Sequence, residues 1–145
     1  MKTKAIKLMI VTLLFSGVMF AQDLSSNQVP SVVFNTFKKE FPKANDVEWE
    51  MKGDRYNVEF EIGWFSDYEA WFKKSGELIR YEMDISKKDL PDAVRQSIKE
   101  QYKGYHVDDA TKIVENNVET YAVEIEKGND ERDLIFSING EQIKP

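Results

Sequence analysis

Glutamates at alternating positions are the first residues in this chain whose type and spacing could support chemistry. They are Glu59, Glu61, Glu69 and Glu82 in the first half, and Glu124 and Glu126 in the second. Paired carboxylates can act as general acid and base, or can bind calcium through their oxygens. Both uses need the carboxylates to converge, and strand alternation ensures only that they share a face. We therefore interpret these glutamates as the solvated face of an antiparallel sheet.

His106 is the only histidine, and the chain has no cysteine. One histidine without cysteine cannot build a zinc site of the usual kind, and no recognisable nucleophile motif accompanies it. The pairs Asp108–Asp109 and Asp130–Glu131 lack the alternating oxygen ligands of a calcium loop. We predict that the protein is not an enzyme and holds no cofactor and no metal ion.

Three aromatic residues form the clearest candidate for a binding site. Trp71 lies between Ala70 and Phe72, which have the apolar parity, so alternation directs Trp71 to the polar face. An exposed tryptophan gives up burial worth roughly 1.5–3 kcal/mol. Trp64 and Phe65 lie in the adjacent hairpin loop, and with Trp71 they would form an aromatic anchor typical of interface hot spots. The predicted charged rim consists of Glu59, Glu61, Glu69, Lys73 and Arg80.

Two structural alternatives to this binding site remain open. Trp64 and Phe65 could fold back over Trp71 as a minor core. A strand bulge near Gly63 could instead reverse the parity and turn Trp71 inward.

The elements that would position these residues follow from the periodicity. Val33, Phe37 and Phe41 have helical spacing, with Pro30 suited to the first turn and Pro42 ending the helix. The period then changes to two, which predicts strands near 47–51, 56–62, 68–72 and 79–85. The pattern indicates a helix followed by a four-stranded antiparallel meander.

The second half of the chain repeats this order. Pro30 corresponds to Pro91 at an offset of 61 residues, and Phe72 to Phe136 at an offset of 64. Hairpin loops of unequal length would produce such a drift in offset. We predict an α+β fold made of two tandem helix-plus-meander repeats, at 29–87 and 88–145, after a flexible lead-in at 22–28. The repeats should merge into one sheet of roughly eight strands, with both helices on one face and the other face open.

Residues 1–21 are predicted to be a signal peptide. They combine a basic start with a 13-residue apolar run, which is too short to span a membrane. The predicted location is therefore the periplasm or the extracellular medium, without a lipid-anchoring cysteine. Removing the three lysines of this segment leaves 17 basic and 26 acidic residues, a formal net charge of −9. Such a charge disfavours nucleic acid and anionic membrane surfaces as partners.

Several of these residues together resemble the PepSY-like family of exported bacterial proteins, whose repeats resemble the β-lactamase-inhibitor-protein fold. The matching segments are Val29-Pro30, Phe41 to Ala44, Val47 to Trp49, Tyr56 to Phe60, and Trp71-Phe72 with Gly76-Glu77. The resemblance covers residues 29–145 and implies a binding or inhibitory role, with inhibitor relatives that use the concave open sheet face. It carries no catalytic residue set.

The second repeat departs from this pattern. Lys112 is aligned with Trp49, and Ile135 with Trp71. An aromatic site is therefore expected only in the first repeat. The favoured hypothesis is an exported, non-catalytic binding module for an unknown envelope or extracellular protein or peptide, and inhibition of a target is its sharper form. The alternative is a periplasmic protein that binds a small molecule or divalent cation on its acidic face. A third hypothesis is an enzyme that uses a carboxylate pair, but the sequence contains no motif that supports it.

Overall fold

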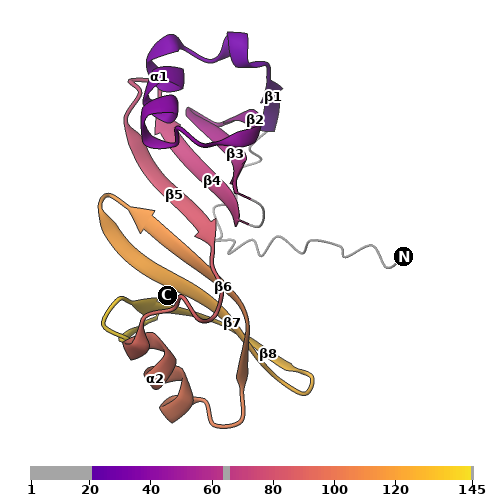
Figure 1. Cartoon of the computed structure of the whole chain (residues 1–145), viewed down its shortest axis with the longest axis vertical. Coiled ribbons are helices and arrows are strands. Elements are labelled where there is room, and N and C mark those ends of the chain that lie inside the picture. The colour runs from indigo at the N-terminus through magenta and orange to yellow at the C-terminus, as the bar shows by residue number, and fades with distance from the viewer. Residues whose placement is uncertain (1–20, 64–65, 145) are drawn as a thin grey trace.

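The computed structural model describes residues 21–63 and 66–144, which form one antiparallel sheet in which each strand pairs with the next (Figure 1). Over these ranges the sheet has nine strands in the order β1 to β9. The strands are β1 (Ala21–Leu24), β2 (Asn45–Lys52), β3 (Arg55–Ile62), β4 (Ser66–Lys73), β5 (Leu78–Asp84), β6 (His106–Glu115), β7 (Val118–Lys127), β8 (Asp130–Ser137) and β9 (Gln142–Ile143). The helices are α1 (Ser31–Glu40), α2 (Asp92–Gln101) and the short 3-10 helix η1 (Ser26–Gln28).

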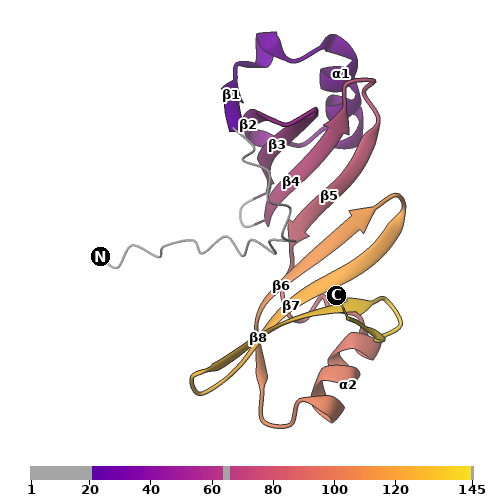
Figure 2. The same cartoon turned by 180° about the vertical axis from the view of Figure 1, so that it is seen from behind.

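Both repeats merge into one sheet, as predicted, because β5 pairs with β6. Both α-helices cover the same face of it. Tyr81 of β5 packs against the core under α1, and its partner on β6 is Val114. Val114 has the same strand parity as Ala110, which lies in the core under α2. Figures 1 and 2 show the two helices at opposite ends of the molecule.

The segment before α1 is not the flexible lead-in predicted for residues 22–28. β1 pairs with β2, with Leu24 opposite Trp49, and η1 follows before the helix. Leu24 packs against the first core. The sheet therefore has one strand more than the expected eight. β1 is short and half polar, so its stability comes from pairing with a distant strand, which a local pattern does not show.

The pairing reveals how the two repeats share β5. At an offset of 61 residues, the β1–β2 pair Ala21–Lys52 corresponds to the β5–β6 pair Glu82–Ile113. The end of β5 therefore pairs with the first meander strand of the second repeat, β6, as β1 pairs with the first meander strand of the first repeat, β2. The start of β5 pairs with β4 as β9 pairs with β8, at an offset of 64. One strand thus completes the first repeat and opens the second.

The step in offset from 61 to 65 arises in the strands, whereas the step back to 64 arises in a loop, because residues 63–65 link β3 to β4 and only residues 128–129 link β7 to β8. β2 and β3 have 8 residues each, whereas β6 and β7 have 10 each. The longer hairpin turns at Asn116 and Asn117, whose φ values of 49° and 65° fit a type I′ turn. Trp49 pairs with Val58 as Ala110 pairs with Val123, so the counterpart of Trp49 is Ala110. The alignment of Lys112 with Trp49 was therefore wrong.

Each helix buries one apolar stripe. Val33 and Phe37 of α1 are fully buried, and Val94 and Ile98 of α2 occupy the corresponding positions. Proline occupies the residue before each helix, where its fixed φ and missing N–H suit a helix start. Within the described part of the chain, no helix is long and apolar enough to cross a membrane.

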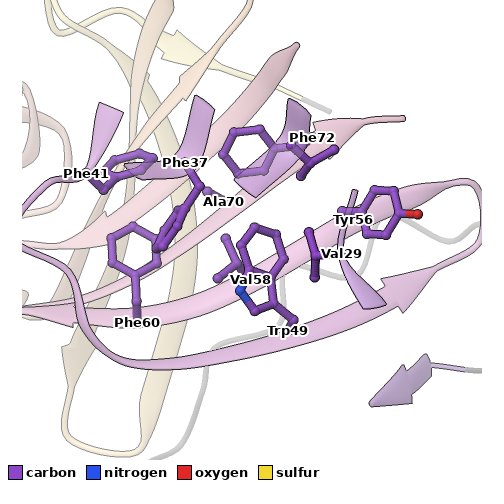
Figure 3. Packing of buried hydrophobic residues seen from close by; sticks show 10 residues of the cluster. Val29, Phe37, Phe41, Trp49, Tyr56, Val58, Phe60, Ala70 and Phe72 are labelled. Atoms are coloured by element: carbon purple, nitrogen blue, oxygen red, sulfur yellow. The ribbon is translucent and has the colours of Figure 1, made fainter. Parts of the chain in front are cut away.

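The first core is built around aromatic rings (Figure 3). Phe37 contacts Trp49 and Phe60 edge to face, with ring centroids 5.2 and 5.1 Å away. Such edge-to-face pairs add to the stabilisation that comes from burying the rings. The second core has mainly aliphatic residues, which are Leu90, Val94, Ile98, Ala110, Tyr121, Val123, Ile125, Leu134 and Phe136. The two clusters supply the apolar burial that holds both helices on the sheet.

Candidate functional site

The sheet face opposite the helices, which we call the open face, carries a row of acids in its first half. Four glutamates on four adjacent strands lie directly opposite one another. This acidic row consists of Glu48, Glu59, Glu69 and Glu82. Like charges directly opposed across strands destabilise a sheet. The row therefore lowers stability except where a cation offsets it.

Further acids extend the row into a shallow hollow of about 260 Å³. This acidic hollow is lined by the acidic row together with Asp46, Glu61, Asp67, Asp84, Phe60 and Tyr68. Burial, and then the charge of Glu69, raises the pKa of the Glu59 carboxyl. Burial also raises the pKa of Asp84, against a hydrogen bond from Thr111 that lowers it. In the described ranges, no three acidic or histidine side chains are grouped to hold a metal ion.

Lys52 offsets the two central members of the acidic row. Its Nζ lies 3.1 Å from Glu69, 3.3 Å from Glu50 and 3.9 Å from Glu59. Burial would lower the pKa of Lys52, but Glu69 and Glu50 raise it above its usual value. One ammonium group thus neutralises three carboxylates only in part.

Asn57 is buried beside the ion pair between Lys52 and Glu69. Its Nδ2 donates to Glu69 Oε1 at 2.9 Å and to the Ala70 carbonyl at 3.3 Å. The side chain is fully buried, and its Oδ1 has no hydrogen-bond partner among the described residues. Asn57 therefore holds Glu69 in place on the open face.

Trp71 lies on the open face, as strand alternation predicts. It is half-buried and lies in register between Asn57 and Arg80, while its neighbours Ala70 and Phe72 are fully buried under α1. A register shift does occur between β4 and β5, directly after Trp71, but the Trp71–Arg80 pairing precedes it. The bulge alternative is therefore wrong for Trp71. Trp64 and Phe65 lie outside the described residues, and so does the fold-back alternative.

Arg80 links the tryptophan to the acids. Its guanidinium carbon lies 5.5 Å from the centre of the Trp71 ring, a cation–π distance. Nε donates to Glu82 Oε1 at 2.8 Å, and Nη1 donates to Glu115 Oε2 at 3.1 Å. These contacts hold Arg80 beside the ring, so the aromatic surface and the acidic row are continuous.

The other two predicted rim residues lie further out. Glu61 is exposed beyond the acidic row, opposite Asp67. Lys73 is exposed at the opposite end of β4 and forms an ion pair with Glu77 at 2.8 Å. The structure therefore brings together Glu59, Glu69, Trp71 and Arg80, with Glu61 and Lys73 on either side of them. That this group binds a partner stays a prediction.

The sequence-based site omitted the contributions of β2 and of Asn57. Glu48, Glu50 and Lys52 all carry the open-face parity of β2. Their alternation with Trp49 was a signal that could have identified them. The burial of Asn57 had no such signal, because a polar residue at a polar position reads as solvated.

The open face changes character in the second half of the sheet. Ile113 and Ala122 face this side but are buried, with 6% and 5% of their surface exposed. Ile135 occupies the position equivalent to Trp71. His106 contacts Glu126 at 2.6 Å near the start of β6. The aromatic and acidic site is thus a property of the first repeat.

Comparison with known proteins identifies the family. The chain matches the family described as "Putative beta-lactamase-inhibitor-like, PepSY-like" over residues 19–65 and 54–144. The chain belongs to the PepSY-like family. The predicted resemblance is confirmed, and the two matched segments agree with the tandem repeat seen in the sheet. No curated protein matches this PepSY-like chain.

Solved structures show the same fold. A BLIP-like (β-lactamase-inhibitor-protein-like) protein from Bacteroides fragilis is 25% identical, covers 79% of this chain and 83% of its own, and superposes with a TM-score of 0.69. A DUF2874 family protein from Bacteroides uniformis is 24% identical, with 79% and 86% covered and a TM-score of 0.70. A structure from Bacteroides eggerthii described as "putative periplasmic proteins" is 21% identical, with 80% and 86% covered and a TM-score of 0.70.

Proposed function

We propose that this PepSY-like protein is an exported, non-catalytic binding module that engages an envelope or extracellular protein or peptide through the open face of its first repeat. The observation that carries the proposal is Trp71, a half-buried tryptophan held by Arg80 on the sheet face opposite α1 and α2. Tryptophan and arginine are enriched among interface hot spots.

The charges around Trp71 support the same function. The acidic row lies on one side of the ring. On the other side, Arg55 of β3 and Lys73 of β4 lie opposite each other in the strand register. A face that changes from negative to positive over a few residues favours one orientation of a partner, because complementary charge sets register more than raw affinity. Trp71 would supply affinity, and Glu59, Glu61, Glu69, Lys73 and Arg80 would supply specificity.

The family and its BLIP-like neighbours favour inhibition as the sharper form of this function. A periplasmic location is proposed from the basic, apolar N-terminal segment, and one neighbour is itself described as periplasmic. If the captured partner is a hydrolase, a stoichiometric amount of this protein should lower its activity.

The test is affinity capture from an envelope extract with the protein from Gln22 onward, a Trp71→Ser variant and an Ile135→Ser variant. Ile135 is the matched control, because it occupies the same position in the second repeat. A partner retained by the parent and by Ile135→Ser, but lost by Trp71→Ser, supports the proposal. Equal retention by all three folded proteins contradicts it.

The acidic hollow supports a second candidate, binding of a divalent cation or a small cationic molecule. Burial raises the pKa of the Glu59 and Asp84 carboxyls, and the charges of neighbouring acids raise it further. A bound cation would relieve that repulsion and stabilise the fold by mass action. Titration with calcium should then raise the thermal midpoint, and an unchanged midpoint at millimolar calcium counts against this candidate.

A further inference from the structure

A second concave site lies beside α2, on the helix side of the sheet. It is a cleft of about 430 Å³ between α2, the loop that precedes it and the segment that follows it. β6 begins at His106, but β5 pairs with it only from Thr111 onward. After Asp84 the chain leaves the sheet toward α2, and this departure leaves the cleft open. Its volume is in the range of small-molecule sites.

Basic side chains line this cleft. They are Lys87 and Lys88 from the loop, and Arg95 and Lys99 from α2, and no carboxylate is among the residues that line it. In the described part of the chain, none of these three lysines has a carboxylate within 4.0 Å of its ammonium nitrogen. The whole protein carries a formal net charge of −6, so a cleft of this sign is not a consequence of composition.

Arg95 holds the cleft together. Its Nη1 donates to the Lys88 carbonyl at 2.7 Å, and its other terminal nitrogen pairs with Asp92. The backbone of the loop is therefore tied to the helix. A pre-formed site binds more tightly than one that must first be ordered.

The floor of the cleft is apolar and aromatic. Ile98 is buried there, and the rings of Tyr102 and Tyr105 pack edge to face with centroids 6.0 Å apart. The Tyr102 hydroxyl donates to Gln142 at 2.9 Å, which fixes its ring. A ligand for this cleft therefore needs an apolar or aromatic body as well as negative charge.

The first repeat provides an internal comparison. At the 61-residue offset, the positions of Lys87, Lys88 and Arg95 are occupied by Ser26, Asn27 and Phe34. Phe34 packs against the first core. The fold therefore does not require Lys87, Lys88 and Arg95, which are basic only in the second repeat, whereas Lys99 corresponds to Lys38.

We propose that the cleft beside α2 binds a small organic anion, with a phosphate or carboxylate group held by Lys87, Lys88 and Lys99 and an apolar body on Tyr102 and Tyr105. This site is independent of the open face. It would give the protein a ligand as well as a partner.

Titration of the isotopically labelled protein from Gln22 onward, followed by amide NMR, tests the proposal. The probes are phenyl phosphate, benzoate and the neutral ring benzyl alcohol. We expect shifts that map to residues 86–107 for at least one anion, and none for benzyl alcohol. Phenyl phosphate alone would identify a phosphate ligand, and benzoate alone a carboxylate. No shifts from either anion at 10 millimolar (about the weakest binding worth pursuing), or equal shifts from the neutral ring, would overturn the proposal.

A matched pair of variants adds a second readout. Lys99→Glu should weaken binding of the anion about fivefold or more, because it removes one attraction and adds a repulsion. Lys38→Glu, at the equivalent position of α1, should leave the affinity unchanged. Both positions are exposed, so both variants should fold. Equal loss in the two variants would show a general effect of charge and would contradict a site in the cleft.

Discussion

At the scale of single residues, side-chain shape holds the first core and charge sets the open face. Phe37 lies among aromatic rings and has no exposed surface (Figure 3). Trp71 and Arg80 lie on the other side of the same sheet, where contact with water is retained. Two predictions belong to this scale, one for the core and one for the acids.

Replacing Phe37 with alanine should lower the free energy of unfolding by about 3–5 kcal/mol, because it removes a buried ring and leaves a cavity that rigid neighbours cannot fill. Urea denaturation measures the loss. Asn35→Ala on the exposed face of the same helix should change the value by less than about 0.5 kcal/mol. A similar small effect of both substitutions would contradict the packing described for α1.

Stability should depend on pH through Glu59. Burial and Glu69 raise the pKa of this carboxyl above its usual value of 4.5, so the folded protein holds the proton more readily than the unfolded chain. This contribution is present below pH 4.5 and is lost as the pH rises through the folded pKa. Glu59→Gln should therefore be more stable than the parent at pH 7, with a difference that vanishes near pH 4 (roughly the carboxyl range).

Glu119 provides a control of opposite sign. Burial would raise the pKa of its carboxyl, but hydrogen bonds from Lys112 and Tyr121 lower it below the usual value. Glu119→Gln should be less stable than the parent at pH 7, and this difference should also vanish as the pH falls. Urea denaturation at several pH values measures both variants. The same sign for the two variants at pH 7 would contradict this account of the charges.

At the scale of elements, a close approach between a turn and a helix fixes each α-helix on the sheet. Gly140 has a φ of 79°, and a Cβ added there would lie 2.4 Å from the Ala93 carbonyl oxygen. Its own carbonyl accepts a hydrogen bond of 2.6 Å from the Ser97 hydroxyl. Gly76 makes the same approach to Val32 of α1, at the 64-residue offset. The turn after the third strand of each repeat therefore sets how near its helix can lie.

Gly140→Ala should destabilise the protein by about 2–3 kcal/mol, because the backbone of α2 must move and the residue is strained at positive φ. Gly128 also has positive φ, but a Cβ there would have no neighbour within 4 Å. Gly128→Ala should therefore cost only about 1 kcal/mol, from backbone strain alone. Thermal unfolding compares the two variants. Equal losses would mean that the turn does not position the helix.

At the scale of the whole molecule, periodicity predicts most of the fold and half of the site. Alternation correctly assigns Val58 and Phe60 to the core and Trp71 to the open face. It fails for β1, although Asp23-Leu24-Ser25 matches Asp84-Ile85-Ser86 at the 61-residue offset. Extending the repeat upstream of the proline would have revealed that strand.

The parts of the site that were not predicted depend on contacts between distant strands. The acidic row exists because four strands align their glutamates, and register is not visible in any single strand. The burial of Asn57 likewise depends on its neighbours across the sheet. The basic cleft beside α2 depends on where β5 leaves the sheet.

The most direct test of the central claim is carboxyl footprinting of this protein with and without its captured partner. The account predicts that Glu48, Glu59 and Glu82 on the open face lose reactivity in the complex. Glu40 and Glu100, which are exposed at the ends of α1 and α2, should react equally in both states. Protection of Glu40 and Glu100, with the open face still fully reactive, would contradict binding through the open face.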